Sequence, residues 1–274
     1  MKPISKENFL AIRNAEGSHR KIFTKTGIKE NKDIPYFSVS FYESIGPIYE
    51  KMTGNKLEKH SSFDFSTYYS HALNESNIDD VKAWEQMMGN YVFLRDCLFA
   101  SIALDMNQTP QSTTDLGIMF RILKYEPSQQ ETERLIYENV TSAMVAAIRK
   151  LPYYKDAKYI ACVPPSPEKQ VDIPSNLAKR IADKLNLTDI TERFSFAGKK
   201  ESAKNLPMRE KWDAWERAGL KMNYNLEGKD VILIDDLYQS GTTVNYTAMV
   251  LQRANVGRIL GLYVVKSMRD TDNQ

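Results

Sequence analysis

The chain has 274 residues, of which 42% are apolar and 26% charged, and its formal net charge is +2. This length holds one large domain or two smaller ones with a buried core, and the composition excludes wholesale disorder. So small a net charge gives no general electrostatic case for binding nucleic acid or a membrane surface, although it leaves local patches open.

Cysteine content and hydropathy narrow the cellular setting. Cys97 and Cys162 are too few for a four-thiolate zinc site or a disulfide framework, and both sit in apolar runs, so we expect buried thiols. No apolar run approaches the roughly 20 residues that span a bilayer, and the N-terminus lacks a signal-type stretch. We therefore expect a cytoplasmic protein with no membrane partner. Three lone histidines in the N-terminal half are expected to be surface or packing residues: His19, His60 and His71.

Residues 1–110 are predicted to form a mainly α-helical region of unknown role. Apolar side chains recur at helical spacing over residues 79–104, which indicates one long helix. Residues 33–65 contain proline, glycine and many aromatics, which favours short helices joined by loops. The polar segment 107–114 contains Pro110 and is typical of a linker, so we place a domain boundary near residue 110.

Residues 111–274 alternate between helical and strand patterns. Helices are predicted over residues 129–150, 175–185 and 242–254, and strands over residues 159–163, 231–234 and 259–265. This alternation predicts an α/β fold, with a parallel sheet, right-handed crossovers and flanking helices. In such sheets ligands bind at the carboxyl ends of the strands.

The segment of residues 231–243 carries the most specific signal. Four apolar residues are followed by Asp235 and Asp236, a short loop, and a helix start that reads Ser-Gly-Thr-Thr. A helix N-terminus offers free N–H groups and a partial positive charge, which suit a phosphate. Gly241 lets the backbone approach a ligand closely, and three neighbours add hydroxyl donors, namely Ser240, Thr242 and Thr243. The two carboxylates suit sugar hydroxyls or waters on Mg²⁺, so the pattern predicts a ribose 5-phosphate site.

Other protein classes also end a buried strand in two acids. P-loop NTPases do so, but this sequence has no G-x-x-x-x-G-K-[ST] motif, and receiver-type folds lack the Ser-Gly-Thr-Thr helix start. A structural or degenerate site stays open as the alternative.

The segment resembles the phosphoribosyl pyrophosphate signature of type I phosphoribosyltransferases, which has four apolar residues, two acids, a variable stretch and Thr/Ser-Gly-x-Thr/Ser. The resemblance implies that residues 240–243 hold the 5-phosphate. It also implies that Asp235 and Asp236 are the catalytic residues that face the ribose hydroxyls and hold Mg²⁺.

Two further segments resemble the competence-associated phosphoribosyltransferase-like proteins. Residues 159–167 resemble their pyrophosphate-binding strand and loop, and residues 122–125 resemble their Leu-Lys-Tyr segment. The implied pyrophosphate contacts are Pro165, Ser166 and Lys169. Those relatives often carry a four-cysteine zinc module, which two cysteines cannot form, so residues 1–110 are something else.

The resemblance implies a phosphoribosyltransferase with Mg²⁺ as its cofactor, in which a nitrogen of a nucleobase or amine displaces pyrophosphate from phosphoribosyl pyrophosphate. Family analogy also suggests a homodimer. The basic segment of residues 194–217 is interpreted as a mobile loop over the substrate, with a solvated surface segment as the alternative. Its cations are Lys199, Lys200, Lys204 and Arg209.

A second interpretation is a catalytically weak module that binds phosphoribosyl pyrophosphate and serves regulation or interaction, in competence or with nucleic acid. No motif names a base, and Pro165 and Pro167 leave few N–H donors for pyrophosphate. A third is a scaffold protein with a vestigial site.

Overall fold

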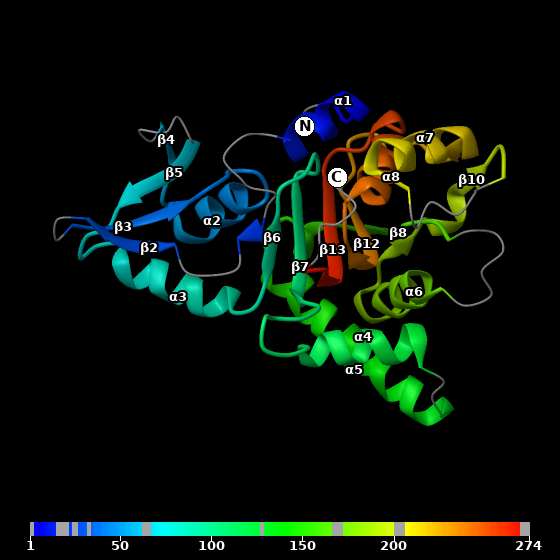
Figure 1. The fold of residues 1–274 in the computed structure, drawn as a ribbon, viewed down its shortest axis with the longest axis horizontal. Coiled ribbons are helices and arrows are strands. Elements are labelled where there is room, and N and C mark those ends of the chain that lie inside the picture. The colour runs from blue at the N-terminus through cyan, green and yellow to red at the C-terminus, as the bar shows by residue number, and fades with distance from the viewer. Residues whose placement is uncertain are drawn as a thin grey trace.

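The computed structural model describes residues 3–14, 22–23, 27–31, 34–61, 67–126, 129–165, 172–199 and 206–268. A seven-stranded sheet forms the centre, with helices on both faces, and a separate four-stranded sheet lies at one end of the molecule (Figure 1). The predicted α/β class, with a mostly parallel sheet and flanking helices, is confirmed.

The central sheet has the strand order β1-β6-β7-β13-β12-β8-β9. Neighbours from β7 to β9 run parallel, whereas β1, β6 and β7 pair antiparallel at one edge. Its strands are β1 (Ile22–Phe23), β6 (Val92–Leu94), β7 (Ala100–Met106), β8 (Tyr159–Cys162), β9 (Thr188–Asp189), β12 (Val231–Tyr238) and β13 (Ile259–Lys266).

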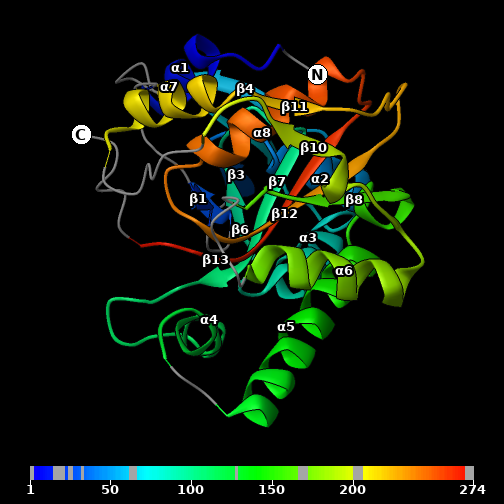
Figure 2. The same cartoon turned by 90° about the vertical axis from the view of Figure 1, so that its right-hand side faces the viewer.

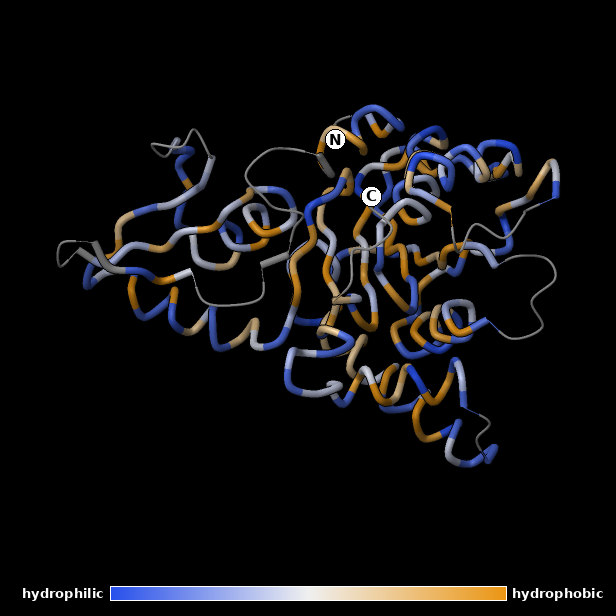
Figure 3. Tube along the Cα trace, in the orientation of Figure 1, coloured by the Kyte–Doolittle hydropathy of each residue, from blue (hydrophilic) through white to orange (hydrophobic). Residues whose placement is uncertain are grey.

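Two helix layers cover this sheet (Figure 2). One layer consists of α1 (Lys6–Asn14), α7 (Met208–Ala218) and α8 (Thr242–Arg253), and the other of α4 (Asp115–Tyr125), α5 (Gln130–Lys150) and α6 (Ile173–Leu185). Along β12, Val231 and Leu233 pack in the core beneath α8, whereas Ile232 and Ile234 pack in the core beneath α5 and α6. Because helices cover both faces here, residues 231–234 are all apolar, and the central strands in Figure 3 carry long orange stretches.

The four-stranded sheet is antiparallel, with the order β2-β3-β5-β4. It contains β2 (Ile28–Asn31), β3 (Ile34–Val39), β4 (Glu58–Ser61) and β5 (Thr67–Ala72), accompanied by α2 (Ile45–Thr53) and α3 (Ile78–Met88). Phe37 stacks on Tyr49 with ring centroids 4.2 Å apart, and Trp84 meets both rings edge-on. In the described part of residues 1–110 there are three helices, α1, α2 and α3, but the short strands between them were not predicted from the sequence.

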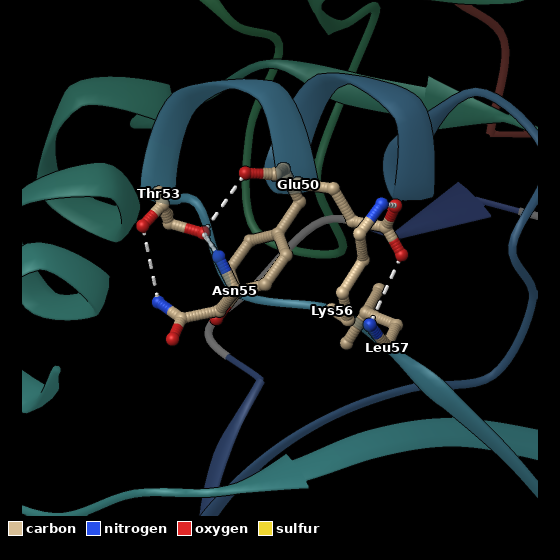
Figure 4. Close-up of polar contacts among 6 residues, drawn as sticks. Glu50, Thr53, Asn55, Lys56 and Leu57 are labelled. Carbon is tan, nitrogen blue, oxygen red and sulfur yellow. Dashed lines mark hydrogen bonds and ion pairs between the residues drawn. The ribbon is translucent and has the colours of Figure 1, made fainter.

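Side-chain contacts turn the chain from α2 into β4 (Figure 4). Gly54 ends the helix in the left-handed conformation, with φ +75°. The Glu50 carboxylate then accepts a hydrogen bond from the Leu57 N–H at 3.0 Å, and the Thr53 hydroxyl accepts one from the Asn55 N–H at 3.2 Å. These contacts pair two backbone N–H groups of the turn that follows the helix.

The helix predicted over residues 79–104 is wrong beyond Met88. Gly89 follows α3 with φ +49°, and the chain continues as β6 and β7. Two short buried strands in succession placed their apolar residues at spacings that resembled a helix. Because β7 lies between β6 and β13, the central sheet draws strands from before the boundary predicted near residue 110.

The predictions for the second half fare better. The helices predicted over residues 129–150, 175–185 and 242–254 correspond to α5, α6 and α8. The predicted strand of residues 231–234 is the first half of β12, which continues through both aspartates to Tyr238. β10 (Phe194–Phe196) and β11 (Leu220–Met222), which flank α7 in the chain, form a separate two-stranded antiparallel sheet. Among the described helices, none is long and apolar enough to cross a membrane.

Candidate functional site

The acidic pair lies at the carboxyl edge of the central sheet. Ile234 of β12 is in register with Cys162, the last residue of β8, so Asp235 and Asp236 extend beyond the end of that neighbour. On the other side, β13 continues to pair with β12. The pair therefore occupies the edge where parallel sheets bind their ligands, as the sequence predicted.

Lys124 from α4 reaches this edge and binds the acidic pair. Its ammonium nitrogen lies 2.8 Å from Oδ2 of Asp236, whose side chain is 12% exposed. Burial works against the charge of Lys124, but the Asp236 carboxylate outweighs it, so the pKa of Lys124 is raised. The ion pair joins the Leu-Lys-Tyr segment to the predicted site, a contact that sequence reasoning did not foresee.

Asp235 differs sharply from an exposed aspartate. Burial raises its pKa to about 8, and the neighbouring charge of Asp236 adds to the rise. At neutral pH the Asp235 carboxyl is therefore mostly protonated, and Lys124 neutralises the charge of Asp236. One neutral acid that can donate and one carboxylate that accepts lie side by side.

The turn after β12 has the form of an anion-binding helix start. Gly241 is the N-cap of α8 and has φ +81°, a left-handed conformation that favours glycine. The Thr242 N–H donates to Ser240 Oγ at 3.3 Å. The N–H groups of Thr243 and Val244 fall in the first helical turn, where α-helix geometry supplies no intrahelical acceptor.

The turn is largely enclosed by protein. Ser240 and Thr242 are buried, and their hydroxyl oxygens lie 3.1 Å apart, so each is within hydrogen-bonding distance of the other. Gln239 and Thr243 on either side are only half-buried. The structure thus brings the four predicted phosphate-binding residues together, and Thr243 is the least buried of them.

The structure describes only some of the residues predicted to contact pyrophosphate or to cover the substrate. Pro165 lies half-buried after β8, whereas Ser166, Lys169, Lys200 and Lys204 lie outside the described residues, as does His19. Lys199 is exposed shortly after β10.

The predicted mobile loop of residues 194–217 is not one loop, because it contains β10 and most of α7. Arg209 is exposed in the first turn of that helix. The buried face of α7 includes Trp212 and Trp215, which pack against Tyr246 of α8.

The two remaining histidines have packing roles. His71 bonds to the Tyr49 hydroxyl and to the Ala72 carbonyl, and His60 stacks on Tyr68. Both lie in the four-stranded sheet.

The donor set determines which cation fits. Within the described part of the chain, no group of three or more His, Cys, Asp or Glu side chains is placed to hold a metal ion. Asp236, and Asp235 once it loses its proton, offer hard oxygen ligands, and Mg²⁺ commonly takes one or two carboxylates together with waters and substrate phosphates. The pair fits a Mg²⁺ ion that arrives with a phosphorylated ligand, not one held by protein groups alone.

A buried carboxylate beneath the turn was missed by the sequence reasoning. Asp96 is 1% exposed, and its Oδ2 accepts hydrogen bonds from the Ser101 hydroxyl at 2.6 Å and the Tyr238 hydroxyl at 3.2 Å. Its one sequence signal is an acid between the apolar runs of β6 and β7.

Comparison with known families agrees with this geometry. Residues 175–271 match the family model of the phosphoribosyl transferase domain. The matched segment runs from α6 to beyond β13 and includes the acidic pair and the turn. The likeness to the phosphoribosyl transferase domain therefore covers this part of the chain. Membership of the competence-associated group stays a prediction.

Several solved structures show a distant likeness. Adenine phosphoribosyltransferase from Leishmania tarentolae is 11% identical, with 51% of this chain and 72% of that chain covered at a TM-score of 0.33. Hypoxanthine phosphoribosyltransferase from Staphylococcus aureus is 18% identical, with 49% and 74% covered at 0.30. An allosteric regulatory enzyme of purine biosynthesis is 12% identical, with 84% and 46% covered at 0.34. Likenesses at such TM-scores say nothing further about this chain, and a search of curated proteins found no match.

Proposed function

We propose that the chain binds phosphoribosyl pyrophosphate with Mg²⁺ and transfers the phosphoribosyl group to a nitrogen acceptor, such as a nucleobase or amine, with release of pyrophosphate. The observation that supports this most is the junction of β12 and α8, which places two neighbouring carboxyl groups and a glycine-capped helix N-terminus on one short stretch of chain. The family match over residues 175–271 includes that junction.

The helix start is assigned to the 5-phosphate. The N–H groups of Thr243 and Val244 would donate to phosphate oxygens, and the dipole of the 12-residue helix α8 favours an anion there. The Thr243 hydroxyl, on the half-buried side of the turn, would add a further donor. Ser240 and Thr242 would shape the turn through their mutual hydrogen bond.

The acidic pair is assigned to the ribose. The Asp236 carboxylate would accept hydrogen bonds from ribose hydroxyls, and the protonated Asp235 would donate one. Together they would orient the sugar so that a nitrogen nucleophile meets the anomeric carbon as the bond to pyrophosphate breaks. Mg²⁺, when bound, would neutralise charge on the pyrophosphate. Catalysis would then consist of positioning and electrostatic stabilisation of an oxocarbenium-like transition state, without a covalent enzyme intermediate.

The pyrophosphate needs cations or N–H donors at the neighbouring strand ends. Lys124 already lies at this edge and would supply one positive charge. We assign further contacts to Pro165, Ser166 and Lys169 after β8, and a covering role to Lys199, Lys200, Lys204 and Arg209.

Calorimetric titration tests the binding half of this proposal. Wild-type protein should bind phosphoribosyl pyrophosphate in the presence of Mg²⁺, and Asp235→Asn with Asp236→Asn should weaken binding by at least about tenfold without unfolding the protein. Asp183→Asn, which alters an exposed carboxylate on α6, is the matched control and should bind as wild type does. Absence of binding by the wild type would contradict the proposal.

Pyrophosphate release tests the transfer half. The assay supplies phosphoribosyl pyrophosphate, Mg²⁺ and a panel of nucleobases and amines in turn. Release that depends on one acceptor and disappears in the double aspartate variant supports transfer. Tight binding with no release for any acceptor would contradict transfer and leave binding standing.

A further inference from the structure

A single buried amide side chain connects the anion-binding turn to a distant segment of the chain. The Gly241 carbonyl accepts hydrogen bonds from the backbone N–H of Asn245 at 2.9 Å and from its side-chain Nδ2 at 2.8 Å. The Asn245 side chain is fully buried, and its Oδ1 accepts a hydrogen bond from the Cys97 N–H at 3.0 Å. Asn245 therefore spans the gap between the turn and the chain that follows β6.

Asp96 makes a second connection between the same two segments. Its Oδ2 accepts a hydrogen bond from the Tyr238 hydroxyl at 3.2 Å, and its Oδ1 accepts one from the Leu98 N–H at 3.0 Å. The Tyr238 hydroxyl in turn lies against Gly241, since a Cβ built there would come within 2.2 Å of it. Asp96 and Cys97 thus hold the turn from two sides.

The segment that holds the turn is itself tied to the N-terminal part of the molecule. The Ser44 hydroxyl, next to the start of α2, donates to the Leu94 carbonyl at 2.6 Å. The Arg95 guanidinium pairs with the Glu43 carboxylate at 3.2 Å. A continuous series of contacts therefore runs from the four-stranded sheet region to the turn after β12.

Peptide geometry gives this arrangement a consequence for anion binding. In a trans peptide the carbonyl and the following N–H point in opposite directions. Because Asn245 holds the Gly241 carbonyl toward the protein interior, the Thr242 N–H points into the turn, where it meets Ser240 Oγ. A flipped peptide would present a carbonyl oxygen to the ligand, and that oxygen would repel a phosphate.

We propose that Asn245 and Asp96 are positioning residues for the anion-binding turn, and that they keep the Gly241–Thr242 peptide in the orientation that points its carbonyl oxygen away from a bound phosphate. The inference rests on the proposed function, because the ligand is the phosphate assigned to this turn. It also gives residues 94–98, with Glu43 and Ser44 that hold them, a share in ligand affinity.

Asn245→Asp is the informative variant. It keeps the oxygen that accepts from Cys97 but replaces the donor to the Gly241 carbonyl with a second oxygen. The matched control is Thr247→Val, because the Thr247 hydroxyl is also fully buried in α8 and donates to a carbonyl four residues earlier, that of Thr243, at 2.9 Å.

The probe is ribose 5-phosphate, with binding measured by calorimetry well below the melting temperature of each variant. Asn245→Asp should weaken affinity at least about tenfold, and Thr247→Val less than about threefold. Hydrogen exchange at the Thr242 and Thr243 amides should accelerate in the first variant only. Wild-type affinity in folded Asn245→Asp would overturn the proposal.

Two further measurements keep the inference decidable. If Asn245→Asp does not fold, Tyr238→Phe replaces it, since this change deletes only the hydroxyl that reaches Asp96; reduced affinity supports the proposal and unchanged affinity overturns it. If the wild type binds no ribose 5-phosphate, the proposed function fails on its own. A crystal structure of Asn245→Asp or Tyr238→Phe then decides the peptide orientation, and an unmoved Gly241 carbonyl overturns the inference.

Discussion

The ammonium of Lys124 lies 2.8 Å from the carboxylate of Asp236, although the two residues are 112 positions apart. The contact joins α4 to the carboxyl end of β12 and neutralises one of two adjacent acids. It explains how two carboxyl groups share a largely buried edge of the sheet, since the alternative is an unpaired charge away from water.

Removing Lys124 should destabilise the protein. Lys124→Met leaves the Asp236 carboxylate without its cation and should lower the free energy of unfolding by about 1–2 kcal/mol. Combining it with Asp236→Asn should cost less than the sum of the single changes. A double-mutant cycle from urea unfolding measures this coupling. The Lys56–Glu50 pair serves as the control, because the Lys56 side chain is 84% exposed and should show almost no coupling. Equal coupling in the two cycles would contradict the assignment.

The raised pKa of Asp235 predicts a pH dependence of stability. Its folded-state pKa, about 8, exceeds the ordinary aspartate value, so the folded protein binds this proton more tightly than the unfolded chain does. The stabilising effect is complete below about pH 4 and is lost as the pH rises toward 8. Asp235→Asn should therefore unfold at a higher temperature than wild type near pH 8, by at least about 1 kcal/mol in stability, with the difference shrinking toward pH 5. Thermal unfolding across this range, with Asp183→Asn as the control, checks it. A difference that grows on acidification would show the opposite sign.

Gly241 should tolerate substitution less well than a glycine of similar conformation elsewhere. Gly54 has φ +75° and no atom within 4 Å of an added Cβ, whereas at Gly241, with φ +81°, the Cβ would lie 2.2 Å from the Tyr238 hydroxyl. Gly54→Ala should cost about 1 kcal/mol from backbone strain alone. Gly241→Ala should cost about 1–3 kcal/mol more, and Tyr238→Phe should recover part of that difference. Denaturant unfolding of Gly54→Ala, Gly241→Ala and Gly241→Ala combined with Tyr238→Phe measures the loss of stability at each glycine and the part that Tyr238 causes. Indistinguishable losses at the two glycines would mean that Tyr238 does not enclose the turn.

Cys162 should resist thiol reagents in the folded protein. Its side chain is fully buried, and burial raises the pKa of the thiol to about 12, so almost no thiolate is present at neutral pH. With Cys97→Ser as the background, labelling by a disulfide reagent should occur only as the protein unfolds, many times faster in denaturant than in buffer. Rapid labelling of the native variant would indicate that β8 opens readily.

The sequence predicted elements well where one physical signal dominated. The first half of β12, residues 231–234, is an uninterrupted apolar run because helices cover both of its faces, and α5 has a long amphipathic pattern. The prediction of one helix over residues 79–104 was wrong because the apolar residues of two short strands after α3 recur at spacings close to those of a helix. Propensity and periodicity are local, so they do not reveal which edge of a sheet a short strand joins.

The residues of the candidate site that are contiguous in the sequence were predicted, and those brought in by tertiary contacts were not. Residues 235–243 are contiguous, so their pattern alone located the acidic pair and the turn. Lys124, Asp96 and Asn245 reach the site through tertiary contacts that no spacing in one sequence encodes. Of these three, Lys124 had been noticed as part of a family-like segment, without a partner.

The place of β7 links the two halves of the chain in folding. It fills an interior position of the central sheet, between β6 and β13, while the chain between β7 and β8 forms helices α4 and α5. A polypeptide that began after Met106 would leave the backbone hydrogen-bonding groups of β13 unpaired along one whole side, and an uncovered strand edge invites association with other chains. Residues before Met106 therefore cover a strand edge that the carboxy-terminal strands would otherwise expose.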